Sequence, residues 1–472
     1  MGTSHWPLTD CNAELSLQEQ LAAQFRRAIH QKQLVPGDLV PASRPLAQQL
    51  GVSRGTVVSV MEQLAGEGYL VAHPGKGHFV AALDHLGQSK NEKESHTSPA
   101  VLAAPEHPRP VLDLRPGYPW TQGLGQDPLW KSAWRKATAD LPDAALHEEE
   151  ASGSLRLRAA VAEHLRRARG IITHPGNIHI TSGTAEALVL ITLTLNRIYS
   201  TAQIAVEDPG YPAARQALET AGARVHTVPT SADTGIAVEK IPASAHAVVT
   251  TPSHQYPLGG LMSINDRLAL LRWADRHEAV VVEDDYDSEF RYGRPPLPAL
   301  STLSQGEQVM TIGSFSKILT PALRAGYIYA DGALGRELIR TRAGIGASVS
   351  YLQQVALADY LESGGLARHI ARMRREYRHR RDLLIRRLSG LAGVQTSATS
   401  GGLHAVLHTP VQASQLAAQL RARGTQVALL SSYYAEGLPQ EEDGLVIGYG
   451  QTSSAHLSQA LRQIQEILAT KR

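Results

Sequence analysis

The sequence predicts a small α+β domain followed by a large α/β domain with a mainly parallel sheet and a small C-terminal α+β subdomain. Three observations predict this fold class. Residues 14–82 show helical periodicity and end in two short strand-like runs. Residues 111–472 alternate apolar runs with helical stretches, which is typical of a sheet covered by helices on both faces. Residues 83–110 between them are polar and rich in proline, so we expect a flexible linker.

The composition is that of an ordinary globular chain. Its 472 residues carry a formal net charge of +2, and 43% of them are hydrophobic, so the overall charge says little about a polyanionic partner. Cys11 is the single cysteine, which excludes an intramolecular disulfide and favours a reducing compartment. The sequence shows neither an apolar run that could span a membrane nor a signal-peptide pattern. We therefore expect a cytoplasmic protein without a membrane partner.

The first domain contains the pattern of a helix-turn-helix. Ser43 is predicted to cap a short helix over Arg44–Leu50, which Gly51 ends. Ser53 then caps a second helix over about Arg54–Leu64. A glycine stop followed closely by a serine cap predicts two helices joined by a tight turn.

Two strand-like runs, Tyr69–Ala72 and His78–Ala81, follow and predict a β-hairpin, so the domain reads as a winged helix. Its second helix would enter the major groove of double-stranded DNA. The residues expected to reach phosphates or base edges are Ser43, Arg44, Arg54 and Thr56, with Lys76 from the tip of the hairpin. The alternative is a small helical adaptor domain, because Lys and Arg barely outnumber Asp and Glu here.

This segment resembles the GntR family of winged-helix repressors. The resemblance rests on residues 33–47, 50–57 and 67–70. The family usually has Gly-Ser-Gly-Thr-Phe-Val in the wing, where this chain has Lys76 and His78 in place of Ser and Thr. The resemblance implies that the domain binds promoter DNA with repeated half-sites.

The large domain has a series of apolar runs that predict buried strands. They are Ile178–Ile180, Ile204–Val206, Ala223–Val228, Ala247–Thr250, Val280–Val282, Val309–Ile312 and Tyr327–Tyr329. Ligands of such sheets collect at the carboxyl ends of the strands. The polar residues that follow these runs are therefore the candidate site.

Lys317 follows one of these runs, among small and hydroxyl side chains. A lysine in that setting can form a Schiff base with a carbonyl cofactor. Ser314 just before it and Arg324 seven residues after it could hold a phosphate. Taken alone, the stretch is equally compatible with a surface lysine and a surface arginine.

Other strand ends supply the remaining contacts that one cofactor needs. Gly183 and Thr184 open a helix whose N-terminus could bind a phosphate, although an ordinary capped helix would look the same. A carboxylate in Glu283–Asp287 could keep a pyridine nitrogen protonated, while Tyr286 bonds a phenolic oxygen. Phosphate, pyridinium, phenolic oxygen and aldehyde together indicate pyridoxal 5'-phosphate. No metal site is predicted.

The order of these motifs resembles the fold-type I aminotransferases, over roughly residues 113–469. With the winged helix and linker, the whole chain resembles the MocR/GabR subfamily of pyridoxal-phosphate-dependent transcriptional regulators. The resemblance implies that Lys317 carries the cofactor as a Schiff base and that Asp284 pairs with the pyridinium. The other implied cofactor contacts are Tyr286, Gly183, Thr184, Ser314, Arg324, Tyr211 and His254.

Some positions depart from working aminotransferases. Tyr256 stands where these enzymes usually have the Asn of Asn-Pro-Thr-Gly, and Val446 stands where they tend to have an arginine for the substrate carboxylate. Ala213 stands where some carboxylate-reading relatives have an arginine. Pyridoxal phosphate itself therefore becomes more attractive as the effector than an amino acid.

Three functions remain open on the sequence. The favoured one is a homodimeric, head-to-tail regulator that senses pyridoxal phosphate, or an amine or amino acid bound to it. The second is an active aminotransferase with an added DNA-binding domain. The third is a DNA-binding protein whose large domain only dimerises. The arginine-rich stretch His369–Arg381 is interpreted as a solvated or interdomain helix face.

Overall fold

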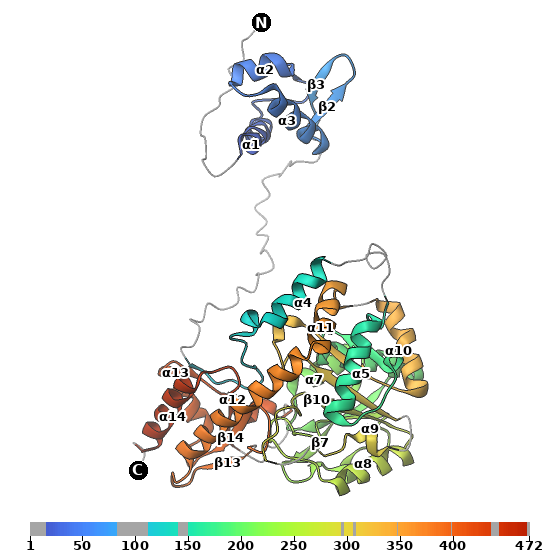
Figure 1. Ribbon diagram of the computed structural model, residues 1–472, viewed down its shortest axis with the longest axis vertical. Coiled ribbons are helices and arrows are strands. Elements are labelled where there is room, and N and C mark those ends of the chain that lie inside the picture. Colours follow the sequence, from blue (N-terminus) through green and yellow to red (C-terminus); the bar gives the residue numbers. More distant parts are fainter. Residues whose placement is uncertain are drawn as a thin grey trace, which may run out of the picture. The chain divides into compact units, whose positions relative to one another are not determined.

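The protein is described by a computed structural model that covers residues 16–82, 112–139, 150–293, 297–304, 308–346, 348–397, 399–435 and 443–469. The chain divides into two compact units, Met1–Glu106 and His107–Arg472, and each has its own core (Figure 1). The predicted linker and Cys11 lie outside the described residues. Within the described ranges, no helix is long and apolar enough to cross a membrane.

The first unit has the predicted winged-helix fold. Its elements are α1 (Leu17–His30), β1 (Leu39–Val40), α2 (Ser43–Leu50), α3 (Arg54–Gly66), β2 (Leu70–His73) and β3 (Gly77–Val80). The three strands pair antiparallel in the order β1-β3-β2. Strand β1 was not predicted, because its two residues are too few to show the alternating pattern of a strand. The prediction that Ser43 caps α2 is wrong by one position. Ala42 is the N-cap, and Ser43 is the first residue of the helix.

The second unit is built on an eight-stranded sheet in the order β5-β12-β11-β10-β9-β6-β7-β8. Its strands are β5 (Ile178–Thr181), β6 (Gln203–Asp208), β7 (Arg224–Ser231), β8 (Gly235–Ile236), β9 (Ala247–Thr250), β10 (Val280–Asp285), β11 (Val309–Ser314) and β12 (Gly326–Tyr329). The strands from β11 to β7 run parallel, whereas β12 runs antiparallel to both of its neighbours. The prediction of a mainly parallel sheet is confirmed.

Helices cover both faces of this sheet, as continuous apolar strands require. Val280 and Val282 pack on one face against α6 (Thr184–Tyr199), α7 (Pro212–Thr220) and α10 (Gly332–Ile345). Val281 packs on the other face, where α8 (Ile264–Arg276) contributes Trp273. Because successive side chains of a strand point to opposite faces, the carboxylates that follow these valines are also divided between the two faces.

Further elements surround the sheet. They are α4 (Pro128–Ala139), α5 (Leu155–Arg169), α9 (Leu300–Leu303), α11 (Tyr351–Glu362) and the long α12 (Gly365–Leu388). The smaller C-terminal part contains a sheet in the order β13-β14-β17-β16, with strands Gln395–Ser397, His404–His408, Leu445–Gly448 and Ala428–Leu429. Its helices are α13 (Ala413–Ala422) and α14 (Ser454–Ala469), which lie with β13 and β14 in an orange and red group beside the larger sheet (Figure 1). The predicted α+β subdomain is confirmed.

Candidate functional site

The predicted DNA-contacting residues lie around the start of α3. The Ser53 hydroxyl caps α3 by accepting a hydrogen bond from the Thr56 N–H at 3.1 Å. The Arg54 Nε donates to the Ser43 hydroxyl at 3.3 Å, which ties the starts of α2 and α3 together. Ser43 and Lys76 border one crevice of about 390 Å³. Arg44, Arg54 and Lys76 are exposed. The first turn of α3 and the wing therefore present exposed cationic groups, as a DNA-reading face needs.

In the second unit, strand register brings the predicted cofactor residues to one edge of the sheet. Asp284 of β10 lies opposite Ile312 of β11. Ser314 at the end of β11 lies opposite Gly326 of β12, and Gly326 lies opposite Thr181 at the end of β5. Because β12 is antiparallel, its beginning, with Arg324 before it, reaches the same edge as the ends of its neighbours.

Lys317 follows β11 and points to a glycine far away in the sequence. Its Nζ donates to the Gly117 carbonyl oxygen at 2.6 Å. Burial lowers the pKa of the lysine, while Asp284 and Asp287 act in the opposite direction. A Cβ at Gly117, whose φ is +93°, would lie 3.0 Å from Nζ. Gly117 was not predicted, because it lies 200 positions from Lys317 and the sequence around it carries no sign of that contact.

Asp284 is buried, and its Oδ1 has no hydrogen-bond partner among the described residues. Burial raises the pKa of its carboxyl to about 7; the negative charge of Asp285 adds to the effect and Lys317 opposes it. Asp285 points to the other face, where the Arg169 Nε lies 2.7 Å from its Oδ2. An orphaned carboxylate oxygen of this kind fits the protonated ring nitrogen of a pyridine.

The Tyr286 hydroxyl is held by His254. It donates to the His254 carbonyl oxygen at 2.8 Å and lies 2.9 Å from the His254 Nδ1. That Nδ1 also lies 3.0 Å from Oδ2 of Asp287. His254, predicted as a cofactor contact, therefore meets Tyr286 and Asp287. Asp287 was not predicted as part of this network.

The predicted phosphate-binding residues surround a helix N-terminus. Gly183 is the N-cap of α6 with φ 119°, and among the described residues no side chain caps this end. A Cβ at Gly326 would lie 3.1 Å from the Gly183 Cα, so glycine lets the two segments approach closely. Thr184 is the first residue of α6, and Ser314 is buried at the end of β11. Arg324 is exposed and adopts a left-handed backbone, φ 45° and ψ 54°, a costly conformation typical of functional sites.

Aromatic rings form the wall of the site toward the C-terminal part. Tyr256 packs edge-to-face on Tyr211, Tyr286, His404 and Tyr433, with ring centroids 5.9, 5.6, 5.2 and 5.4 Å away. Its hydroxyl lies 3.3 Å from that of Tyr433. Tyr433 and His404 were not predicted, because they come from the C-terminal part.

His254, Asp287 and His404 place their potential metal-binding atoms within 4.8 Å of one another. The His404 Nε2 lies 2.9 Å from the Pro257 carbonyl oxygen, and burial lowers the pKa of His404 to about 3. A Cβ at Gly402 would lie 2.2 Å from the His254 Cε1. Tight packing and hydrogen bonds at these rings favour a polar network over a metal centre.

Comparisons with known proteins agree with both units. Residues 17–80 match the gntR family of bacterial regulatory proteins, and residues 130–460 match aminotransferase class I and II. The HTH-type pyridoxine biosynthesis transcriptional regulator PdxR of Corynebacterium glutamicum is 39% identical over 96% of each chain. The probable rhizopine catabolism regulatory protein MocR of Rhizobium meliloti is 31% identical over 93% of this chain and 91% of that one.

The chain belongs to the MocR subfamily of GntR-type transcriptional regulators. It is a DNA-binding regulator with an aminotransferase-like domain, and pyridoxal 5'-phosphate is the cofactor of that domain. Among solved structures, kynurenine aminotransferase of Pyrococcus horikoshii and the α-aminoadipate aminotransferase LysN of Thermus thermophilus share its fold. Each has a TM-score of 0.66 and 24% identity over 76% of this chain; the shares of their own chains are 91% and 92%.

Proposed function

We propose that this regulator senses pyridoxal 5'-phosphate at Lys317 and changes its affinity for promoter DNA when the cofactor binds. The observation that carries the proposal is the combination of Lys317 and Asp284, which fit the cofactor, with the absence of the arginine that aminotransferases tend to have for the substrate carboxylate. Val446 stands at the position of that arginine. Val446 is fully buried in an apolar cluster with Leu258 and Tyr433. The guanidinium of Arg215 in α7 is engaged elsewhere, since it donates to the carbonyl oxygens of Tyr433 and Tyr434, both at 3.1 Å.

The regulated genes in this proposal are those of vitamin B6 synthesis. The 39% identical relative named for pyridoxine biosynthesis supports this assignment. An amine or amino acid that reacts with the bound cofactor is the other effector class. A head-to-tail homodimer in the cytoplasm would present two winged helices to repeated half-sites.

The residues divide the work of holding the cofactor. Its aldehyde, when bound, is the group that an amine can attack. Burial lowers the pKa of Lys317, so a larger fraction of its amine is unprotonated and nucleophilic. Asp284 would hold a proton on the ring nitrogen, and Tyr286 would donate to the ring hydroxyl oxygen. The uncapped start of α6 would receive the phosphate.

The test is fluorescence anisotropy on DNA from upstream of this gene and of vitamin B6 genes, with and without pyridoxal phosphate. We expect specific binding at moderate salt and a change of affinity on adding the cofactor. Lys317→Ala should bind the same DNA but lose the response. Absence of specific binding to any of these fragments, measured against scrambled DNA, would contradict the proposal.

Enzymatic turnover is the second candidate function. The aminotransferase-like fold favours it. Tyr256 at the position of a ring-hydroxyl contact and Val446 at the position of the substrate-carboxylate arginine weigh against it. We propose at most a residual half-reaction. Steady turnover of an amino donor and a keto acceptor by the purified protein would establish the enzyme instead.

A further inference from the structure

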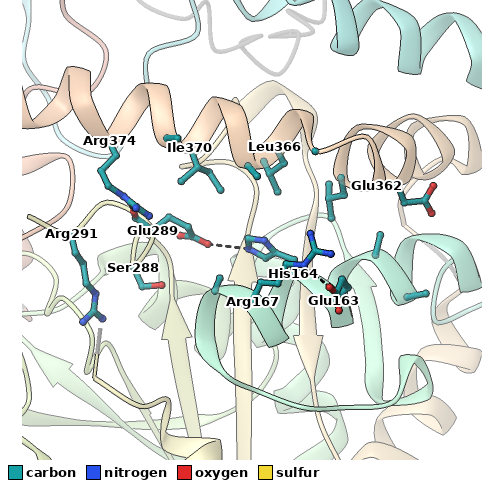
Figure 2. Close-up of a pocket in the computed structure, with 17 residues that line it drawn as sticks. Glu163, His164, Arg167, Ser288, Glu289, Arg291, Glu362, Leu366, Ile370 and Arg374 are labelled. Carbon is teal, nitrogen blue, oxygen red and sulfur yellow. Dashed lines mark hydrogen bonds and ion pairs between the residues drawn. The ribbon is translucent and has the colours of Figure 1, made fainter. Parts of the chain in front are cut away.

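A second pocket lies away from the cofactor residues, between α5 and α12. It has a volume of about 750 Å³, within the range of small-molecule sites. Leu366 and Ile370 of α12 form its apolar side, and His164 and Arg167 of α5 lie opposite them (Figure 2). Glu289 and Arg374 lie at one end (Figure 2). None of the residues predicted to hold the cofactor lines this pocket.

The carboxylates of this pocket are already paired. The Glu289 Oε1 lies 3.3 Å from the His164 Nε2, and Glu289 is 9% exposed. Burial raises the pKa of the Glu289 carboxyl, but the His164 hydrogen bond and the Arg169 charge outweigh it, so the pKa is lowered and the group stays ionised. Its Oε2 is buried without a partner among the described residues.

The other two acids that line the pocket also form ion pairs with arginines. Glu163 pairs with Arg166 as well as Arg167, and Glu362 pairs with Arg156. The Nε of Arg374 donates to the Glu289 main-chain oxygen at 2.8 Å. The outer end of its guanidinium is directed to the pocket (Figure 2). Among the described residues, the lining holds three glutamates and three arginines, and Arg374 is the arginine whose side chain lies beside the apolar wall (Figure 2).

The three segments that line the pocket are α5, residues 288–291 and α12. Each of them contacts, or adjoins in the chain, residues next to the proposed cofactor site. Arg169, next to the lining residue Ala168, donates to the Ser253 hydroxyl at 3.0 Å, beside His254. The lining residues Ser288 and Glu289 follow Tyr286 and Asp287 in the chain.

The third wall, α12, contacts the residue that follows Lys317. His369, next to the lining residue Ile370, places its Nε2 2.9 Å from the carbonyl oxygen of Ile318, the residue after Lys317. A molecule that changed the spacing between α5 and α12 would therefore move neighbours of Lys317, Tyr286 and His254.

We propose that this pocket is a second effector site, which takes an organic anion with an apolar body and is coupled to cofactor binding. The apolar body would lie on Leu366 and Ile370, and the anionic group would meet Arg374. This inference goes beyond the function proposed above and does not depend on which effector reacts at Lys317.

The binding test uses three probes of one shape on the full-length protein loaded with pyridoxal phosphate: benzoate, neutral benzamide and cationic benzyltrimethylammonium. None of them can form a Schiff base. We expect calorimetry to show benzoate binding about 10- to 100-fold tighter than benzamide, because a charge-assisted hydrogen bond contributes that much. Equal or tighter binding of benzamide or the cation would overturn the anion assignment.

Variants then locate the site. Ala371→Trp should fill the pocket and abolish benzoate binding, and Arg374→Gln should weaken it at least fivefold. His379→Trp is the matched control, an exposed position of the same helix that does not line the pocket, and should leave binding unchanged. If Ala371→Trp does not fold, the exposed Arg374→Gln decides. Benzoate binding that survives both variants lies elsewhere and overturns the proposal.

Coupling has its own readout. Saturating benzoate should change the dissociation constant of pyridoxal phosphate at least threefold in the unaltered protein and not in the variants that lose benzoate. Cofactor loading should change benzoate affinity by the same factor, because linkage is reciprocal. Benzoate binding with no effect on cofactor affinity would overturn the coupling. DNA binding is not needed for any of these measurements.

Discussion

Asp284 is a carboxylate that the fold buries beside other acids, and within the described part of the chain its Oδ1 meets no hydrogen-bond partner. Such a group is costly to ionise until a cation meets it. Its pKa is raised to about 7 by burial and by Asp285, well above that of an aspartate in an unfolded chain. Below about pH 7 the protonated form is therefore favoured in the folded protein without cofactor, and a bound pyridinium would favour the ionised form.

This raised pKa predicts a pH-dependent stability. Between about pH 4 and pH 7 the folded, cofactor-free protein binds more protons than the unfolded chain, so its stability falls as pH rises. The contribution of Asp284 is on the order of 1–4 kcal/mol across that window. Urea unfolding at pH 5 and pH 7 should show this decrease, and Asp284→Asn should reduce it. An identical pH dependence in both proteins would contradict the prediction.

Asp284→Asn should also weaken cofactor binding, because the charge opposite the ring nitrogen is lost. We expect a decrease of about 10- to 100-fold, the contribution of a hydrogen bond to a charged group. Equilibrium dialysis of pyridoxal phosphate measures it. Asp285→Asn is not a suitable control, since Arg169 depends on that carboxylate; Asp331→Asn at the start of α10 preserves the site and should bind normally.

In the function proposed above, the network of Tyr286, His254 and Asp287 would face the ring hydroxyl of the cofactor. Tyr256 stands at the position of the usual Asn donor and its hydroxyl lies by Tyr433, so Tyr286 would be the donor, its proton turning from the His254 carbonyl oxygen to the ring oxygen. Tyr286→Phe should raise the pH midpoint of the visible absorbance of the lysine-bound cofactor by about one unit, because the anionic ring oxygen loses a donor.

The same measurement on His254→Ala and on the double variant tests positioning. We expect His254→Ala to shift the midpoint in the same direction and the double variant to match Tyr286→Phe alone. Additive shifts would show that His254 acts independently of Tyr286.

The helix α3 and the wing belong to the domain that this chain has in addition to its aminotransferase-like domain. Arg54→Ala and Lys76→Ala should each weaken DNA binding, by about 1–3 kcal/mol where a base contact is lost. The slope of log affinity against log salt should fall by about one for each phosphate contact. Lys32→Ala removes a positive charge just after α1 and serves as the control. If Lys32→Ala lowered DNA affinity by the same amount, the effect would be due to the change in net charge and not to contacts of Arg54 or Lys76 with DNA.

For the whole molecule, sensing means that cofactor binding and DNA binding are linked by a coupling free energy. If pyridoxal phosphate changes DNA affinity by some factor, saturating operator DNA must change pyridoxal phosphate affinity by the same factor. Dialysis of the cofactor with and without DNA, beside anisotropy with and without cofactor, measures both sides. Agreement within error supports a single regulator, and cofactor affinity that is unaffected by DNA would show two independent domains in one chain.

Much of the fold and the site could be predicted from local sequence. Buried strands are short apolar runs, and ligands of parallel sheets meet their carboxyl ends, so Lys317, Tyr286 and a carboxylate within Glu283–Asp287 could be singled out from position; the choice of Asp284 came from the family resemblance. The winged helix followed from the glycine stop after Leu50 and the serine cap before Arg54. These features depend on a few consecutive residues, and for that reason they can be read in a chain that has not folded.

Contacts between distant segments could not be found in this way. Gly117 meets Lys317 across 200 positions, and Tyr433 reaches Tyr256 from the C-terminal part, because packing of whole elements sets those distances. The alternation of a strand assigns Asp284 to the cofactor side and Asp285 to Arg169, but the side that faces the cofactor depends on which helices cover the sheet. Local chemistry therefore marked the residues proposed to bind pyridoxal phosphate, and three-dimensional packing determined which residues they contact within the protein.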